Sequence, residues 1–263
     1  MPNFIEVAGR RIAYDLHKGR TPTVVFLGGL RSDMTGTKAS FLADWARQHG
    51  QAYLRLDYSG HGASSGRFAD GRIGDWLADA LAVIEAASSG PVVLVGSSLG
   101  GWIALLVARH LSERVRGLLL IAPAPDFTER LIWNALTGEE RARLEREGHL
   151  TLPAGGEGEE PLAISYPFIV EARAHLVLKG YNPVPIHVPV RILHGMRDKD
   201  VPWELSFELM ERLLAKDLAL TLVREGDHRL SSPGELRRLR ATLEELLETV
   251  AADNREQPGS DRA

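Results

Sequence analysis

A short serine run flanked by glycines carries the clearest chemical signal in this chain. Residues 96–100 (GSSLG) fit the pattern G-x-S-x-G, directly after the apolar run 91–95 (PVVLV) and directly before a helical pattern. In this context the central serine sits in a sharp turn between a strand and a helix, so small residues must flank it. The turn lifts the hydroxyl clear of the sheet, at a helix N-terminus that favours developing negative charge. We therefore predict that Ser98 is a nucleophile.

A glycine-rich turn without catalytic chemistry is the alternative for this run. Such a turn would hold a phosphate group or no ligand. The run matches neither the dinucleotide pattern G-x-G-x-x-G nor the phosphate-binding loop with its lysine. Ser97 has the same side chain as Ser98, but its position in the pattern is wrong.

A histidine must take the proton of such a serine, and the chain has nine histidines. In the chain order Ser, Asp, His the base comes last, after the final strand. His228 meets this requirement, because it lies in a polar loop just beyond the apolar run 218–223. His194 ends a buried strand, where we expect it to pack or hydrogen-bond locally. His61 is expected to shape a turn, and His175 to lie on a helix surface.

An acid is needed to hold the imidazole tautomer and to stabilise the imidazolium. The loop HGMRDKDVP places Asp198 and Asp200 after the apolar run 189–193. Either carboxylate can serve, but Asp200, two residues ahead of Pro202, is better placed to start the next helix. We predict Asp198 as the acid, with Asp126 as a weaker alternative.

Acyl transfer also needs backbone N–H groups aimed at the developing oxyanion. One usually comes from the residue after the nucleophile, here Leu99. The loop FLGGLR follows an early strand, and its glycines let the backbone approach a substrate closely. We assign the second donor to Leu30, with Gly29 as the near alternative. A plain glycine turn is compatible with this assignment.

The elements that must position these groups alternate along the chain between strands and helices. This order predicts an α/β fold with a mostly parallel central sheet covered by helices on both faces. An opening hairpin would add antiparallel edge strands. The predicted strands span 4–7, 11–16, 23–27, 52–56, 91–95, 115–122, 189–193 and 218–223, and the predicted helices span 41–49, 73–87, 102–110, 204–215 and 233–250.

Residues 123–188 interrupt this alternation. They contain short helical patterns and no clear buried strand, and they are too many for an ordinary loop. We predict a core formed by residues 1–122 and 189–252, a small helical lid at 123–188, and a disordered polar tail at 253–263. Trp133 and Phe168 in the lid, and Arg31 beside the oxyanion loop, are candidate substrate contacts, although packing or a surface salt bridge explains each equally well.

The composition limits the other classes of function. The chain has 263 residues, no cysteine and a net charge of −4, with acids and bases mixed along it. Disulfides and thiol catalysis are excluded, and no basic stripe indicates a nucleic-acid partner. The N-terminal residues do not fit a secretory signal, and no apolar run is long enough to span a bilayer. We expect a soluble cytoplasmic protein.

Six segments together resemble one subfamily of α/β hydrolases, the one that includes the mitochondrial palmitoyl-protein thioesterase also described as an acyl-glucuronide esterase. They are, in chain order, FLGGLRSDMTGTKA, LDYSGHGASSG, VGSSLGGW, ISYPFIVEARAH, LHGMRDKDVPW and DHRLS. The resemblance covers roughly residues 4–250. It implies the α/β-hydrolase fold, a triad of Ser98, Asp198 and His228, and hydrolysis of carboxylic esters, thioesters or acyl-glucuronides without a metal or cofactor. The chain departs from the subfamily in showing no mitochondrial presequence.

We therefore predict a serine hydrolase that acts on small acyl esters or thioesters. Other reactions of the same triad remain open, namely peptide cleavage, C–C bond hydrolysis and perhydrolysis. A ligand-binding protein without catalysis is a second alternative, because a fold does not determine a function.

Overall fold

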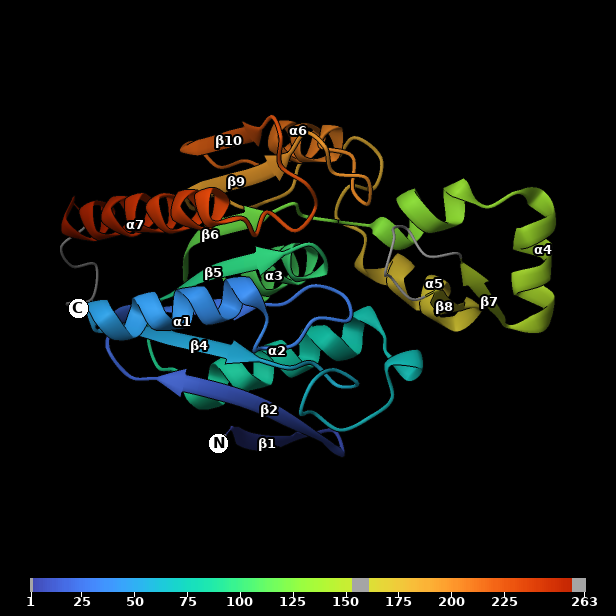
Figure 1. Cartoon of the computed structure of the whole chain (residues 1–263), viewed down its shortest axis with the longest axis horizontal. Coiled ribbons are helices and arrows are strands. Elements are labelled where there is room, and N and C mark those ends of the chain that lie inside the picture. The colour runs from blue at the N-terminus through green and yellow to red at the C-terminus, as the bar shows by residue number, and fades with distance from the viewer. Residues whose placement is uncertain (1, 153–160, 257–263) are drawn as a thin grey trace, which may run out of the picture.

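The computed structural model describes residues 2–152 and 161–256. Within them one sheet has eight strands in the order β1-β2-β4-β3-β5-β6-β9-β10 (Figure 1). β1 and β2 form the opening hairpin, and β2 pairs antiparallel with β4, whereas every other pair in the sheet is parallel. This confirms the predicted sheet. The strands are β1 (Asn3–Val7), β2 (Arg10–His17), β3 (Arg20–Leu27), β4 (Gln51–Leu56), β5 (Val92–Ser97), β6 (Val115–Ile121), β9 (Val190–Gly195) and β10 (Leu218–Val223).

Helices cover both faces of this sheet. α1 (Thr37–His49) and α7 (Pro233–Glu256) pack on one face, where Leu239, Leu243 and Leu246 of α7 form an apolar stripe at helical spacing. α2 (Ile73–Ala87), α3 (Leu99–His110) and α6 (Glu204–Arg212) contribute to the core on the other face. β5 is buried along its whole length, which explains its continuous apolar sequence.

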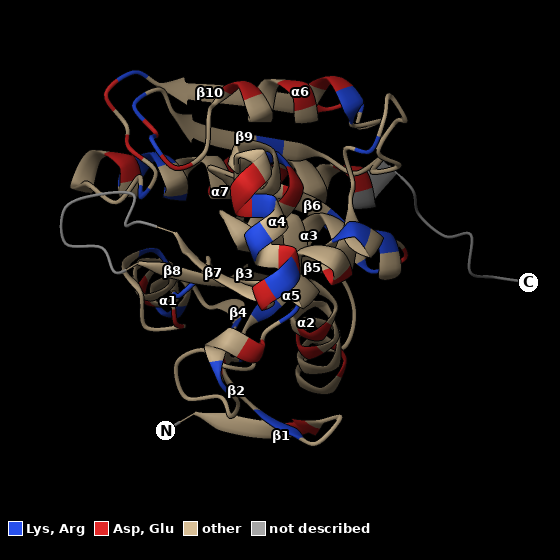
Figure 2. Ribbon diagram, turned by 90° about the vertical axis from the view of Figure 1, so that its right-hand side faces the viewer, with Lys and Arg blue, Asp and Glu red and all other residues tan. Residues whose placement is uncertain are grey.

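The segment between β6 and β9 lies beyond the carboxyl ends of the parallel strands (Figure 1). It contains a π-helical turn (Thr128–Ile132), α4 (Gly138–Glu147) and α5 (Tyr166–Ala172). It also contains two short strands, β7 (His149–Leu152) and β8 (Leu162–Ser165), which pair antiparallel. Short helices and no clear buried strand were expected here; β7 and β8 each have a single buried residue, and periodicity does not identify four-residue strands of this kind. α4 carries acidic and basic residues side by side (Figure 2).

Polar contacts join the two ends of this segment and fasten it to the core. The carboxylate of Asp126 accepts hydrogen bonds from the backbone N–H groups of Val177 (2.8 Å) and Leu178 (2.7 Å), which joins the two connections of the segment. Trp102 of α3 donates its indole N–H to the carbonyl oxygen of His175 at 3.0 Å. Glu171 of α5 accepts the N–H groups at the N-terminus of α2 and contacts His175. The segment is therefore anchored next to the serine turn.

Several element boundaries differ from the prediction: α1 begins at Thr37 instead of residue 41, α6 ends at Arg212 instead of residue 215, and α3 and α7 also differ. α3 begins at Leu99 rather than at residue 102, because Ser98 itself is the N-cap. α7 continues to Glu256, so the first residues of the predicted disordered tail are helical, and residues 257–263 lie outside the described part of the chain. No helix among the described residues is both long and apolar enough to cross a membrane.

Candidate active site

Ser98 occupies the turn between β5 and α3 in a strained backbone conformation. Its φ is 55° and its ψ is −118°, a region that residues with a side chain rarely adopt. The neighbouring glycines make this turn possible. A Cβ atom at Gly96 would collide with the backbone of Gly100, and one at Gly100 would collide with that of Leu27. The spacing of the G-x-S-x-G run thus reflects close backbone packing.

The structure brings Ser98, His228 and Asp198 together from three loops. His228 Nε2 lies 3.0 Å from Ser98 Oγ, and His228 Nδ1 lies 2.7 Å from Asp198 Oδ2. Ser98 follows β5, Asp198 follows β9 and His228 follows β10. Parallel strands end at one edge of a sheet, so residues 130 positions apart in the chain reach hydrogen-bond distance. The arrangement can move a proton from the serine hydroxyl to the imidazole.

The other candidate acids have different partners. Asp200 is exposed, and its backbone N–H donates to Asp198 Oδ1 at 2.9 Å. Asp126 is buried and holds the backbone of the β6–β9 segment. Asp198 is thus the carboxylate whose hydrogen bond reaches His228. Burial by itself would raise the pKa of Asp198, but the hydrogen bonds from His194 and His228 outweigh it and hold that pKa well below its ordinary range.

The loop after β3 lies against the serine turn. A Cβ atom at Gly29 would be 3.4 Å from Cβ of Ser98. The carbonyl oxygen of Gly29 accepts the N–H of Ser32 at 3.1 Å, which closes a turn around Leu30 and Arg31. Leu30 is the first of the two central residues of this turn, so its N–H takes no part in the hydrogen bond that closes the turn. Leu99 is the first residue of α3, where an N–H has no acceptor within the helix.

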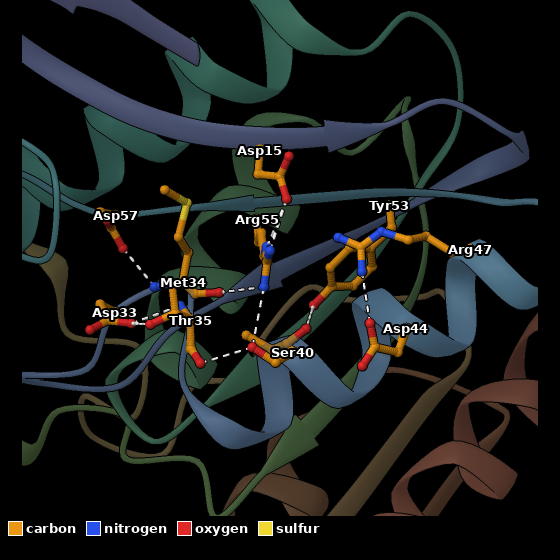
Figure 3. A network of polar contacts seen from close by, with 11 residues as sticks. Asp15, Asp33, Met34, Thr35, Ser40, Asp44, Arg47, Tyr53, Arg55 and Asp57 are labelled. Carbon is orange, nitrogen blue, oxygen red and sulfur yellow. Dashed lines mark hydrogen bonds and ion pairs between the residues drawn. The ribbon is translucent and has the colours of Figure 1, made fainter. Parts of the chain in front are cut away.

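A polar network from the end of β4 holds this loop (Figure 3). Arg55 donates to the carbonyl oxygen of Met34 at 2.8 Å and pairs with Asp15 at 2.9 Å. Asp57 accepts the N–H of Met34 at 2.6 Å and that of Ala63 at 2.8 Å. Both backbone groups of Met34 are therefore held by side chains from one strand end. Burial raises the pKa of Asp57 against the opposing effect of these two hydrogen bonds.

Lys38 holds the loop that carries His228. Its ammonium group donates to the carbonyl oxygen of Arg229, the residue after the histidine. Asp227 adds a second contact by accepting the N–H of Leu230 at 3.0 Å. Burial of the ammonium lowers the pKa of Lys38 to about 8, although the nearby Asp227 acts in the opposite direction.

The three candidate substrate contacts lie in different environments. Arg31 donates to the carbonyl oxygen of Pro161 at 2.7 Å, so its guanidinium contacts the β6–β9 segment. Trp133 packs against Tyr166 and under the guanidinium groups of two arginines. Phe168 is buried beside Trp76 and lines a small apolar pocket together with Leu30. Each substrate-contact role stays a prediction.

Sequence reasoning expected His194 to pack or hydrogen-bond locally, as it does, but missed three residues that support the site: Lys38, Arg55 and Asp57. Their contacts join elements far apart in the chain, and no local pattern reveals such contacts. The spacing of His194 and Asp198 is an exception, since the two lie four residues apart across one tight loop and their side chains are 3.1 Å apart.

Comparisons with known proteins agree with this fold. A sequence profile described as serine aminopeptidase, S33, matches residues 19–146. The mitochondrial palmitoyl-protein thioesterase ABHD10 of mouse is 37% identical over 91% of this chain and 80% of that protein. A crystal structure of a putative hydrolase from Agrobacterium vitis has a TM-score of 0.88 and 42% identity, covering 94% of this chain and 98% of that one. Mouse ABHD10 also has a solved structure, with a TM-score of 0.88 and 36% identity, covering 95% and 99%.

The sheet order, the serine turn and these likenesses define an α/β hydrolase. Within that class, the chain belongs to the ABHD10 family. The expected cytoplasmic location is wrong on this comparison, because the matching relatives from five mammals are named as mitochondrial proteins.

The tight packing at the serine turn leads to a first prediction. Gly100→Ala should lower the free energy of unfolding by about 1–3 kcal/mol and reduce hydrolase activity, because the added methyl group displaces the loop after β3. Urea unfolding and ester turnover measure the two effects. Gly138→Ala is the control, since a Cβ atom there meets nothing within 4 Å. Equal stability of the two variants would contradict this account of the turn.

The pKa of Lys38 leads to a second prediction. Between about pH 8 and pH 10.5 the unfolded chain holds a proton on this lysine that the folded protein has released. The free energy of unfolding should therefore gain a contribution that increases with pH across this window. Lys38→Met should remove that contribution. Urea midpoints of both proteins at several pH values test it, and parallel curves would show that Lys38 titrates normally.

Proposed function

We propose that this protein is a serine hydrolase that cleaves carboxylic ester or thioester bonds of acyl substrates. The observation that carries the proposal is the continuous hydrogen-bonded line from Ser98 through His228 to Asp198. A relative that is named a palmitoyl-protein thioesterase supports esters and thioesters as the bonds that are cleaved. Asp198 remains ionised throughout the physiological pH range, because its pKa lies below the ordinary value.

Acylation begins when His228 takes the proton of Ser98, whose oxygen attacks the acyl carbonyl carbon. Asp198 keeps the proton of His228 on Nδ1, so that Nε2 faces the hydroxyl as an acceptor. In the tetrahedral intermediate, the N–H groups of Leu30 and Leu99 would stabilise the oxyanion. Removing one such donor typically costs about 3–4 kcal/mol in the activation barrier.

Collapse of the intermediate releases the alcohol or thiol, which receives its proton from His228. A water molecule then attacks the acyl-enzyme while His228 acts again as base, and the carboxylic acid leaves. The elements of water are thus added across the ester or thioester bond. Every proton in this sequence moves through one imidazole, which explains why its orientation by Asp198 matters in both halves of the reaction.

We propose that residues 123–188 form a lid over this site and contribute to acyl binding. The small pocket between the loop after β3 and β8 supports this role. Its lining is mostly apolar, as an acyl group requires, and includes Leu30, Phe68, Trp76, Leu162, Ile164 and Phe168. Leu30 would contribute its N–H to the oxyanion and its side chain to the pocket. The pocket therefore begins next to the reacting carbonyl.

Peptide cleavage is the second candidate function. The profile that matches residues 19–146 is described as a serine aminopeptidase, and the same triad chemistry can cleave an amide bond. Relative rates separate the candidates. Turnover of p-nitrophenyl esters, acyl-CoA and S-palmitoyl peptides should exceed turnover of aminoacyl p-nitroanilides.

The third prediction concerns Ser98. Ser98→Ala should lower ester turnover by about 10⁴-fold or more, because triad residues act as a unit. It should also abolish labelling by a fluorophosphonate probe, with the urea midpoint little changed. Ser97→Ala is the matched control and should retain labelling. Ester turnover by Ser98→Ala near the wild-type rate would reject the nucleophile, and failure of the wild-type protein to react would favour a ligand-binding role.

A further inference from the structure

The carboxylate of Asp198 contacts a second imidazole besides that of His228. Asp198 Oδ2 lies 2.7 Å from His228 Nδ1 and 3.1 Å from His194 Nε2. His194 is fully buried at the end of β9, and the Asp198 side chain is fully buried as well. Two histidines therefore share one buried carboxylate oxygen, His194 from the buried side and His228 from a side chain that is 21% exposed. The proposed mechanism uses only one of them.

The neighbours of His194 determine where its hydrogen lies. Nε2 is 3.0 Å from the carbonyl oxygen of Val201, and the other nearby atom is the ionised oxygen of Asp198. Both are acceptors, so Nε2 must carry a hydrogen and share it between them. Nδ1 lies 2.6 Å from Oγ of Ser206, which is also buried. In the neutral ring, the two acceptors at Nε2 fix the tautomer that donates to Asp198, and the Ser206 hydroxyl donates to Nδ1.

The hydrogen bond from His194 completes the coordination of this carboxylate. Oδ1 accepts the backbone N–H groups of Asp200 at 2.9 Å and Val201 at 2.8 Å. Oδ2 accepts the two imidazoles. A carboxylate has about four lone-pair sites, and here all four positions have donors. The group cannot rotate without breaking one of these contacts, so its orientation toward His228 is set by the loop that His194 closes.

We propose that His194 is a positioning residue that sets both the orientation and the basicity of Asp198. This inference rests on the proposed serine hydrolase mechanism. By donating to Oδ2, His194 withdraws negative charge from the oxygen that faces His228. Asp198 then stabilises the His228 imidazolium less strongly than a carboxylate without this donor would. The low pKa of Asp198 agrees with this role, since the hydrogen bond from His194 lowers it against the effect of burial.

The expected effect of removing the donor is a shift in the pKa of His228. Without His194 the shared oxygen becomes more basic, the imidazolium is better stabilised, and the pKa of His228 rises. The charged groups around His228 stay the same: Asp200 beside Asp198, Asp227 and Arg229 on its own loop, and Lys38 from α1. A change between variants at position 194 therefore reports the hydrogen bond to Asp198.

The experiment compares His194→Leu with His194→Gln. Leucine removes the donor, whereas glutamine keeps an N–H group at a similar reach. Histidine NMR titrations in the full-length Ser98→Ala protein measure the pKa of His228 without any need for activity. The same substitutions in the wild-type background give kcat, KM and the acid limb of kcat/KM. Ser206→Ala is the matched control, because it disturbs the same buried cluster but leaves the donor to Asp198 in place.

His194→Leu should raise the pKa of His228 by about half a unit or more and lower kcat roughly 10- to 100-fold, the size expected for a lost hydrogen bond to a charged group. KM should change little, because His194 contacts no substrate. His194→Gln should recover most of both effects, and Ser206→Ala should leave the pKa of His228 where it is.

Two results would overturn the inference. One is a His228 pKa that is unchanged or lower in a folded His194→Leu protein. The other, which applies even if His194→Leu does not fold, is a folded His194→Gln protein whose His228 pKa is raised by half a unit or more above that of Ser206→Ala, or whose activity falls more than 100-fold. Neither result would affect the nucleophile, whose failure would instead appear as ester turnover by Ser98→Ala.

Discussion

The parallel direction of the central strands is the constraint on which the site depends. β3, β5, β9 and β10 all end at the same edge of the sheet, so the loops that follow them meet there. The loops after β5, β9 and β10 carry the hydroxyl of Ser98, the carboxylate of Asp198 and the imidazole of His228. The loop after β3 carries the backbone N–H groups proposed for the oxyanion. None of these loops is long, and each is fixed close to its strand. The strand order therefore determines the site geometry.

Support for the site comes from polar side chains as much as from packing. Arg55 and Asp57 hold the loop after β3, Lys38 holds the loop after β10, and His194 holds the carboxylate after β9. Asp57, Lys38 and Asp198 are each deprived of water, and burial alone would favour the neutral form of every one. Asp198 differs because its hydrogen bonds outweigh burial and hold its pKa below the ordinary value. That difference suits a group whose role is to stabilise a neighbouring positive charge.

The β6–β9 segment links substrate access to the same framework. Its two connections are joined through Asp126, and α5 is fastened to the N-terminus of α2 through Glu171. Arg31 extends from the loop after β3 to Pro161. The residues proposed to stabilise the oxyanion and those that line the apolar pocket are consequently parts of one connected unit. A displacement of the β6–β9 segment should therefore also displace the loop that carries Leu30, through the contact between Arg31 and Pro161.

The sequence by itself determined the features that depend on neighbouring residues, namely the serine turn and the buried strands. Glycines around Ser98 reflect a turn that closes within five residues, and continuous apolar runs reflect strands buried on both faces, so the fold class and the serine were predictable. The chain order also indicated His228 as the base and a carboxylate of the loop HGMRDKDVP as the acid. Tertiary structure alone decided that Asp198 rather than Asp200 or Asp126 reaches His228, because that depends on how two loops 30 residues apart are aimed. It also revealed the contacts of Arg55 and Lys38, since hydrogen bonds between distant segments leave no periodic signal in the sequence. The two short strands β7 and β8 were missed for a related reason: their pairing, and not their four-residue patterns, makes them strands.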